Sequence, residues 1–293
     1  MRRSGWMYAL MLPGLVYFIV FHYVPLAGNA VAFQDYSPFL GVQGSDWVGW
    51  SNFVALLTDP QAINAIKNTL IVSLLQIVFA FPAPILLALL LNSLLSTKIT
   101  RFVQSVVYLP HFISWVIIVS IWQDVLGGAG PVSELFASLG LGHINIMTNP
   151  DTFKILITSQ VIWKDIGWGT IIYFAAMLSI PTDLYESAAC DCAGPLRRMW
   201  HVTLPGILPV TLLLLIIRLG HVLSVGFEQI ILQQPAVGVQ VSDVLDTFVY
   251  NRGLVGGDWG IATAAGLVKG VIGTALVLGA NKLAKRAGTE GLF

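Results

Sequence analysis

The chain has 293 residues, of which 56% are hydrophobic and 10% are charged, and its formal net charge is zero. Soluble domains carry about 25% charged residues, so this composition indicates an integral membrane protein. The neutral balance and the lack of a dense basic block exclude general affinity for nucleic acid. The two cysteines, Cys190 and Cys192, are too close for a good intrachain disulfide, and two thiolates alone do not close a zinc site, so we expect no metal.

Six apolar runs are long enough to cross a bilayer, which takes about 20 residues in a helix. They occupy residues 6–27, 68–95, 102–124, 153–179, 204–227 and 258–283. The first run follows Arg2 and Arg3 but is longer than the core of an ordinary secretion signal, so we interpret it as a retained span. Prolines such as Pro82 and Pro110 predict kinks inside the runs. The sequence therefore predicts an all-α, six-span protein in which residues 1–293 form one membrane domain.

The positions of lysine and arginine predict the orientation, because basic residues resist translocation. With the N-terminus in the cytoplasm, the inner segments hold Arg2, Arg3, Lys98, Arg101, Arg197, Arg198, Lys282, Lys285 and Arg286. The outer segments then hold only Lys67, Lys154 and Arg252. We therefore expect both termini, and the connection between the fourth and fifth spans, to lie in the cytoplasm.

That connection, residues 182–203, has the pattern of a short helix. Asp183 follows a proline at a typical N-cap position, and Glu186 can reach back to it as in a capping box. Gly194 followed by Pro195 is a strong stop signal. A helix over 184–193 with several alanines has a thin surface that fits a groove of another protein. The alternative is an interfacial helix that only links two spans.

The same stretch resembles the cytoplasmic loop of binding-protein-dependent ABC importer permeases, whose pattern is E-A-A-x3-G-x9-I-x-L-P. The pattern positions are filled here, in order, by Glu186, Ser187, Ala188, Cys192, Val202, Leu204 and Pro205. The spacing is kept, and the main departure is Cys192 at the glycine, where the family is thought to turn or approach its partner closely. The resemblance implies an ATPase-coupling surface, which we extend to Asp191, Gly194, Arg197 and Arg198. The two arginines can pair with acids of the ATPase or with lipid phosphates.

The resemblance extends over nearly the whole chain. The segments "PGLVYFIVFHYVPLAG", "YLPHFISW", "WKDIGWGTIIYFAAML", "VGFEQIIL" and "DVLDTFVYNRGL" are similar to polysaccharide-type permease subunits of carbohydrate importers. This implies the type I importer permease fold, a bacterial inner-membrane location and an oligosaccharide or other sugar as substrate. It also implies a second homologous permease, an ATPase dimer and an extracytoplasmic solute-binding protein as partners.

The residues themselves support a division of labour between subunits. No G-x-x-x-x-G-K-[ST] motif occurs in the chain, so a P-loop is absent from the sequence. We expect no cofactor here, with ATP and Mg²⁺ bound by the partner ATPase. A compact helix on the inner face is a device for receiving the resulting motion.

Polar residues inside the spans mark a candidate substrate pathway, because ionisable groups in a bilayer usually face a bundle interior or a water-filled cavity. The candidates on the fourth and fifth spans are Gln160, Trp163, Lys164, Trp168, Arg218 and His221. Amides and cations can bind sugar hydroxyls, and an indole can pack on a pyranose. The alternative is that these groups pair with each other or with the second permease. The mid-span cations Lys164, Arg218 and Lys269 outnumber the single acid Asp165, which permits an acidic oligosaccharide as cargo.

Two other functions compete with the permease interpretation. An ion- or proton-coupled secondary transporter for a small polar solute would explain intramembrane charges, but it should show two related halves, and none is visible. An intramembrane enzyme would need a motif such as H-E-x-x-H or G-x-S-x-G, which the sequence lacks. We therefore expect a transport subunit with no catalytic residues.

Overall fold

The structure is a computed structural model that describes residues 5–94 and 96–286. Arg2 and Arg3, which entered the orientation argument, lie outside the described residues. Within them the chain is almost entirely helical, and the only strands are a two-residue pair, β1 (Gln34–Asp35) antiparallel to β2 (Asp46–Trp47). The predicted all-helical class is therefore confirmed.

Six helical segments are long and apolar enough to cross a membrane, as the sequence predicts. They are Trp6–Phe33, Pro60–Asn92, Trp115–Ser138, Phe153–Leu178, Pro195–Gly220 and Trp259–Arg286. The fourth and sixth agree with the predicted spans within a few residues. The chain is thus a multi-pass membrane protein.

The chain divides into two compact units. The first combines Met1–Ile63 with Thr247–Val271, and the second combines Asn64–Asp246 with Ile272–Phe293. The expectation that 1–293 acts as one membrane domain stays a prediction.

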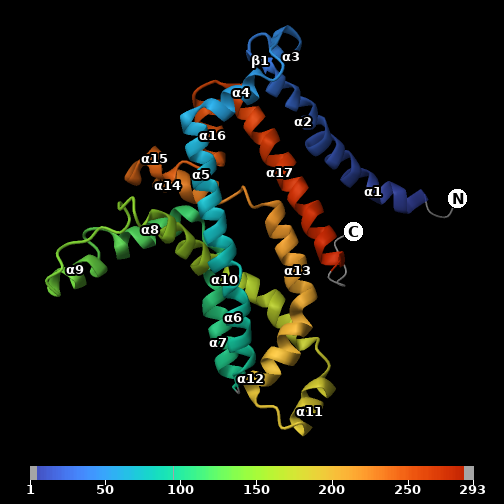
Figure 1. Cartoon of the computed structure of the whole chain (residues 1–293), viewed down its shortest axis with the longest axis vertical. Coiled ribbons are helices and arrows are strands. Elements are labelled where there is room, and N and C mark those ends of the chain that lie inside the picture. The colour runs from blue at the N-terminus through green and yellow to red at the C-terminus, as the bar shows by residue number, and fades with distance from the viewer. Residues whose placement is uncertain (1–4, 95, 287–293) are drawn as a thin grey trace. The chain divides into compact units, whose positions relative to one another are not determined.

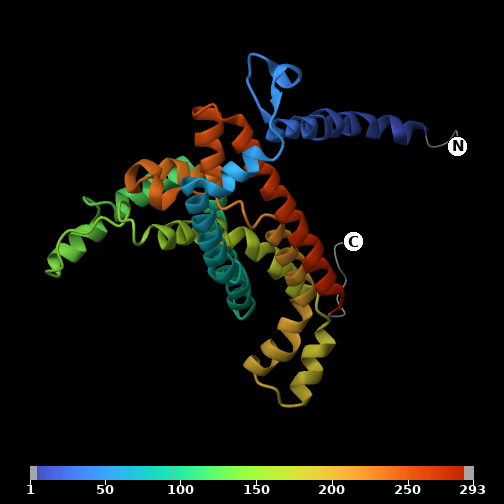
Figure 2. The same ribbon diagram turned by 45° about the horizontal axis from the view of Figure 1, so that its top comes forward.

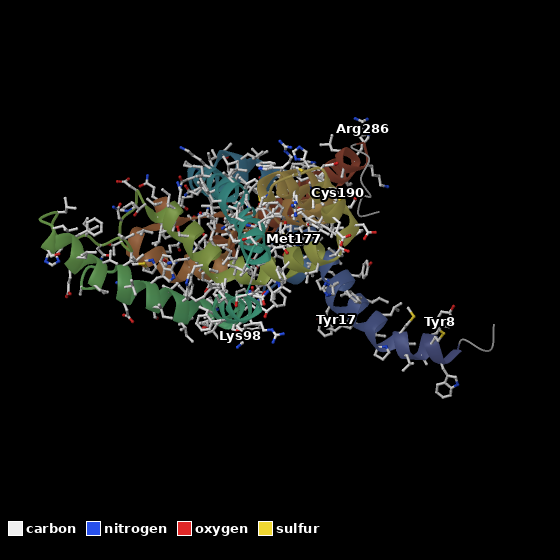
Figure 3. The ribbon with its side chains drawn as sticks, turned by 90° about the horizontal axis from the view of Figure 1, so that it is seen from below. Tyr8, Tyr17, Lys98, Met177, Cys190 and Arg286 are labelled. Atoms are coloured by element: carbon white, nitrogen blue, oxygen red, sulfur yellow. The ribbon has the colours of Figure 1, made fainter. Side chains whose placement is uncertain are left out.

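The first unit begins with a continuous helical rod. It consists of α1 (Gly5–Phe18), the π-helix η2 (Ile19–Tyr23), α2 (Val24–Leu26) and the 3-10 helix η3 (Ala27–Phe33). Figure 3 shows the side chains of Tyr8 and Tyr17 projecting from α1, and both are exposed. An apolar rod with exposed side chains suits a lipid or protein surround.

The rest of the first unit is a small cap. Its elements are β1, α3 (Gly41–Gly44), β2, α4 (Ser51–Thr58), most of α16 (Leu245–Val249), the π-helix η7 (Tyr250–Val255) and the first half of α17 (Trp259–Arg286). The Asn52 amide donates to the carbonyls of Ala32 and Gln34, at 3.0 and 2.9 Å, and so holds the hairpin to α4. The Arg252 guanidinium pairs with Asp258 at 3.1 Å and with Asp59 at 3.7 Å.

The second unit contains the remaining helices. In chain order they are α5 (Pro60–Leu75), the π-helix η4 (Gln76–Ala80), α6 (Ala83–Asn92), α7 (Thr97–Tyr108), the 3-10 helix η5 (Leu109–Phe112), α8 (Trp115–Leu126), α9 (Pro131–Ser138), α10 (Phe153–Leu178), α11 (Thr182–Cys190), α12 (Pro195–Arg198), the π-helix η6 (Met199–Thr203), α13 (Leu204–Gly220), α14 (Phe227–Val237) and α15 (Val239–Ser242). Figure 1 shows α10 passing among α6, α8 and α13. It is the central helix of this unit.

Two apolar clusters form the core of the second unit, one near each end of α10. The first joins α10 to α14 and contains Val72, Phe153, Ile157, Val225, Ile230, Val237 and Val244. The second joins α10 to α6 and α13 and contains Ala88, Tyr173, Met177, Ile180 and Ile207. Burying these side chains fixes α10 against its neighbours at both ends.

The predicted third span, 102–124, is wrong as a single helix. The helix α7 ends at Tyr108, a 3-10 turn covers Leu109–Phe112, and α8 starts only at Trp115. Pro110 supplies no backbone N–H and its ring clashes with the carbonyl four residues earlier, which favours a break of the α-helix at this point. The segment long enough to span is Trp115–Ser138, not 102–124.

The predicted fifth span, 204–227, also ends too late. The helix α13 stops at Gly220, and the backbone does not return to a helix until Phe227. Gly226 adopts φ 107, a left-handed value that glycine reaches without a steric penalty. The intervening Leu223 and Val225 are buried, so this apolar stretch is a buried connection and not helix.

Small residues let α10 approach its neighbours closely. A Cβ on Gly167 would collide with the backbone carbonyl of Val107 in α7, and a Cβ on Gly169 would lie 2.7 Å from the Pro84 ring of α6. Close backbone contact of this kind is typical of membrane helix pairs.

We expect Gly167→Ala to destabilise the second unit, because the added methyl meets a backbone atom that cannot move aside. Overpacking of this kind costs about 1–3 kcal/mol, and each kcal/mol lowers the unfolding midpoint of a chain of this size by roughly 2–4 °C. Thermal unfolding of the detergent-solubilised chain measures the shift. Gly279→Ala is the matched control, because a Cβ there meets nothing within 4 Å. Equal midpoints for the two variants would contradict the close α7–α10 contact.

Candidate translocation cavity and loop 182–203

The second unit contains an open cavity of about 390 Å³ bounded by η4, α6, α10 and α13. Its polar lining comes from Gln76, Asp165, Arg218 and His221. Its apolar lining includes Phe81, Pro84, Ile172, Tyr173 and Leu214. A mostly apolar wall with a few convergent polar groups is the usual character of a small-molecule site.

Arg218 is held in the cavity by a buried glutamine. One guanidinium nitrogen, Nη2, donates a hydrogen bond to Oε1 of Gln76. The Gln76 side chain is 2% exposed, and its Nε2 donates to the carbonyl of Val225 at 3.2 Å. That second bond directs Oε1 toward Arg218. Gln76 is also the first residue of the π-helix η4, and π-helical turns inside α-helices are frequent at functional sites.

Asp165 has a different partner. Its Oδ1 lies 2.9 Å from Nδ1 of His111, and the imidazole stacks flat on the Trp168 indole, with centroids 4.6 Å apart and planes 6° apart. Among the described residues no acid lies within 4.0 Å of the Arg218 guanidinium. Arg218 and Asp165 therefore line the same cavity without forming an ion pair.

Lys164 stabilises the break between α7 and α8. Its Nζ donates to the carbonyl of His111 at 3.0 Å and to the carbonyl of Ile113, and it lies 5.4 Å from the Trp115 ring centroid. A broken helix leaves carbonyl groups without their usual partners, and in a membrane such groups must be satisfied within the protein. The ammonium group supplies these bonds.

The six predicted pathway residues therefore separate into two groups. Arg218 and His221 line the cavity, whereas Gln160, Trp163, Lys164 and Trp168 do not. Gln160 is fully buried and accepts from the amides of Gln229 and Gln233, at 2.7 and 3.0 Å. Trp163 packs edge-on against Trp122 at 6.3 Å. For these four residues, contact with a solute stays a prediction.

Sequence analysis missed Gln76 and Tyr173 as cavity residues and did not place Asp165 among the site candidates. Gln76 had a visible signal, since it is a lone amide in an apolar run. Tyr173 had none, because an aromatic residue in an apolar helix is ordinary core material.

The helix α11 in loop 182–203 begins earlier than predicted. Its N-cap is Pro181, in an extended conformation with φ −55 and ψ 130, and no side chain caps it. The predicted capping box of Asp183 and Glu186 is therefore wrong, because the proline sets the entry into the helix and puts Asp183 inside the first turn. Glu186 lies beyond that turn and is exposed, and the described residues give its carboxylate no hydrogen bond.

The end of α11 explains why a glycine suits position 192. Cys192 has φ 56 and is the only residue other than glycine with a positive φ in the described chain. Its amide donates to the carbonyl of Ala189 at 3.0 Å, and the amide of Ala193 donates to Ala188 at 2.9 Å. These two bonds are those of a Schellman motif, in which the left-handed position is usually glycine. Cys192 holds that position with a side chain.

Loop 182–203 is braced internally by two hydrogen bonds and packs against the core between the helices on either side of it. The Tyr185 hydroxyl lies 3.0 Å from Oγ1 of Thr203, and Nε of Arg198 donates to the carbonyl of Ala193 at 2.7 Å. Tyr185 and Leu204 pack against the second core cluster. Figures 1 and 2 show α11 and α12 side by side at the ends of α10 and α13.

The other predicted coupling residues remain at the surface of this loop. Gly194 is the N-cap of α12 and not a helix stop of α11. Exposed positions are Glu186, Ser187, Cys190, Asp191, Cys192, Gly194, Arg197 and Pro205, and Figure 3 labels Cys190 among them. Ala188 is partly buried. The roles of these residues stay predictions.

A family model described as a binding-protein-dependent transport system inner membrane component matches residues 80–288. The chain belongs to this family. The permease resemblance predicted from the sequence is thereby confirmed, and the protein is a permease subunit of an ABC importer. The alternative of an ion- or proton-coupled secondary transporter is overturned by this family assignment. The family consists of transport permeases and not enzymes.

The similarity to known relatives extends over nearly the whole chain. It is 45% identical over 292 residues to the polygalacturonan/rhamnogalacturonan transport system permease protein YteP of Bacillus subtilis, across 99% of this chain and 91% of that one. It is 30% identical over 270 residues to the sn-glycerol-3-phosphate transport system permease protein UgpA of Pectobacterium atrosepticum, across 91% and 90%. A chain in the crystal structure of a bacterial alginate ABC transporter, in complex with an alginate pentasaccharide-bound periplasmic protein, matches with TM-score 0.92 and 40% identity, across 99% and 98%.

We expect Cys192→Gly to stabilise the end of α11 by about 1 kcal/mol. A left-handed residue with a side chain costs about 1–2 kcal/mol, and the extra freedom of glycine in the unfolded chain offsets about 0.5–1 kcal/mol of the gain. Hydrogen exchange at the amides of residues 192 and 193 measures the effect as slower exchange. Cys190→Gly, two residues earlier in regular helix, should speed exchange. Changes in the same direction for both variants would rule out the left-handed assignment.

Proposed function

We propose that this permease forms half of the translocation pathway of an ATP-driven oligosaccharide importer in the bacterial inner membrane. Its partners are a second homologous permease, an ATPase dimer and an extracytoplasmic solute-binding protein. The solved alginate transporter, a 40% identical neighbour in complex with a periplasmic protein, supports the last of these.

One geometric observation carries the proposal. Loop 182–203 joins the end of α10 to the start of α13, and the same two helices supply Asp165, Tyr173 and Arg218 to the cavity. Because the loop is cross-linked by its own hydrogen bonds and Tyr185 of α11 packs against the core cluster shared by α10 and α13, a displacement of the loop tilts the cavity walls. This is the rigid-element motion by which a remote site changes a binding site.

The energy for this motion comes from the partner ATPase, which holds ATP and Mg²⁺. The sequence of the permease has no P-loop motif to hold the nucleotide itself. Glu186 is the residue of the loop best suited to contact the ATPase. Its carboxylate is exposed and makes no hydrogen bond or ion pair with the described residues.

The solute class that fits best is an acidic oligosaccharide. YteP is named for polygalacturonan and rhamnogalacturonan, and a second solved neighbour, 41% identical, imports the acidic polysaccharide alginate. Uronate units carry a carboxylate at neutral pH. The cavity of the permease presents Arg218, a cation that is always protonated.

The native cysteines report the side of the membrane on which loop 182–203 lies. Cys190 and Cys192 are the only cysteines of the chain, and both are exposed. We expect a membrane-impermeant maleimide to label them several-fold faster in inverted vesicles than in intact spheroplasts, because basic residues hold this loop in the cytoplasm. The control is Phe39→Cys in a background with both native cysteines replaced by serine. Phe39 is 99% exposed in an outer connection and should label in spheroplasts. Labelling of the native pair from outside would remove the proposed ATPase contact.

Glu186→Lys tests the contact itself. We expect at least a tenfold loss of transport per ATP hydrolysed, because a reversed charge in a protein interface leaves two groups unpaired and costs about 2–5 kcal/mol. Uptake and ATP hydrolysis are measured together in proteoliposomes that hold the complete complex. Lys98→Glu is a charge reversal of equal size in the first turn of α7 and should change the ratio little. An unchanged ratio in Glu186→Lys counts against the role of α11.

A further inference from the structure

We propose that Arg218 and Gln76 form a carboxylate-binding site in the permease, which holds one uronate carboxylate of the cargo as it crosses the cavity. The inference rests on the proposed function, since it assigns a residue-level specificity site to the cavity of an oligosaccharide importer.

The charge of Arg218 forms no ion pair in the described chain. The guanidinium lies at a mostly apolar wall, its side-chain hydrogen bond goes to the neutral amide of Gln76, and no acid of the described residues is within 4.0 Å. Asp165 in the same lining attracts it electrostatically without pairing with it. An intramembrane cation without a directly bound anion is costly and usually faces an ion or substrate pathway. An anionic ligand would supply the direct pair.

The acid that shares the cavity is already engaged. Asp165 Oδ1 is 2.9 Å from His111 Nδ1, and the His111 ring is itself fixed by stacking on Trp168. His111 thus draws the carboxylate toward the α7–α8 break and away from α13. The remaining titratable group of the lining, His221, cannot act as the counter-ion because its charged form is a cation.

Gln76 fixes the direction in which the guanidinium presents its other donors. Its Nε2 donates a hydrogen bond to the Val225 carbonyl. This bond orients Oε1 so that it accepts from Arg218 Nη2. A guanidinium carries five N–H donors in a planar fork, and two of them can bind both oxygens of one carboxylate. Gln76 occupies one corner of the fork and leaves the rest for a ligand.

The other mid-span cations do not offer this site. Lys164 lies outside the cavity lining and donates its hydrogen bonds to the carbonyls of His111 and Ile113. Lys269 belongs to the other compact unit. The cavity has about 390 Å³, at the small end of the roughly 300–1,000 Å³ of small-molecule sites, and Phe81 and Tyr173 offer aromatic surface to a sugar ring. A short stretch of uronate fits both the charge and the wall.

Arginine modification tests the site without relying on the binding protein. The purified complex of the permease with its partner subunits is treated with phenylglyoxal, and modification of each arginine is followed by peptide mass spectrometry. Trigalacturonate in excess should slow modification of Arg218 at least threefold, whereas its methyl ester, which lacks the carboxylate charge, should not. Exposed Arg197 is the internal control and should react equally with both. Equal protection of Arg218 by the two saccharides, or none by either, overturns the site.

Substitution of Gln76 tests the geometry while keeping the cation. Gln76→Glu has the same size and places a carboxylate against Arg218, so it should compete with the solute and abolish the selective protection by trigalacturonate. Transport at saturating trigalacturonate-loaded binding protein should fall about tenfold in Gln76→Glu and in Arg218→Gln, with the concentration of binding protein at half-maximal rate unchanged. Arg218→Lys should recover part of the rate. Lys269→Gln, an equal loss of charge in the other unit, should retain most of the transport.

The outcomes separate the site from the function. Suppose that the wild-type complex transports trigalacturonate, that trigalacturonate still selectively protects Arg218 in the Gln76→Glu complex, and that this variant transports at the wild-type rate. That result overturns the carboxylate site and leaves the importer function standing. A wild-type complex that transports no saccharide overturns the function and the site with it. If the Arg218→Gln complex fails to assemble, phenylglyoxal modification of Arg218 in the wild-type and Gln76→Glu complexes still tests the carboxylate site.

Discussion

Backbone carbonyl groups inside a bilayer must be hydrogen-bonded by the protein, and the second unit of this permease depends on that constraint at two helix breaks. At the α7–α8 break, Lys164 donates to the carbonyls of His111 and Ile113. In the buried connection after α13, Ser73 donates to Val222 and Gln76 to Val225. Polar side chains that look costly in apolar helices thus stabilise irregular backbone, and the connection after α13 contributes His221 to the cavity lining.

This division of labour explains why the charged groups of the spans differ in role. Lys164 donates hydrogen bonds to backbone carbonyls, and Asp165 is paired with His111. Arg218 is held by a neutral amide and keeps its net charge for the cavity. The proposed selectivity for acidic saccharides follows from this sorting and not from the number of cations alone, because a cation that is already fully engaged cannot contribute to binding.

The proposed coupling has the same physical basis as the proposed binding, namely rigid attachment. Loop 182–203 is cross-linked internally by the hydrogen bonds of Tyr185 and Arg198, and Tyr185 and Val202 pack it against the core cluster of α10 and α13. The Schellman end of α11 at Cys192 makes the turn between α11 and α12 compact. A loop held in this way transmits a displacement to α10 and α13, whereas a flexible one would absorb it.

The sequence by itself determined the membrane class, the number of spans and the family, because length, hydropathy and local motifs depend only on neighbouring residues. It also located the loop, since glycine, proline and the E-A-A-like spacing are local signals. Only the tertiary structure decided which polar residues reach the cavity. Gln160 and Lys164 are both predicted as pathway residues, but their partners are Gln229 on α14 and the broken backbone after Pro110. Those partners lie tens of residues away in the chain, and hydrogen bonds between distant segments leave no periodic signal in the sequence.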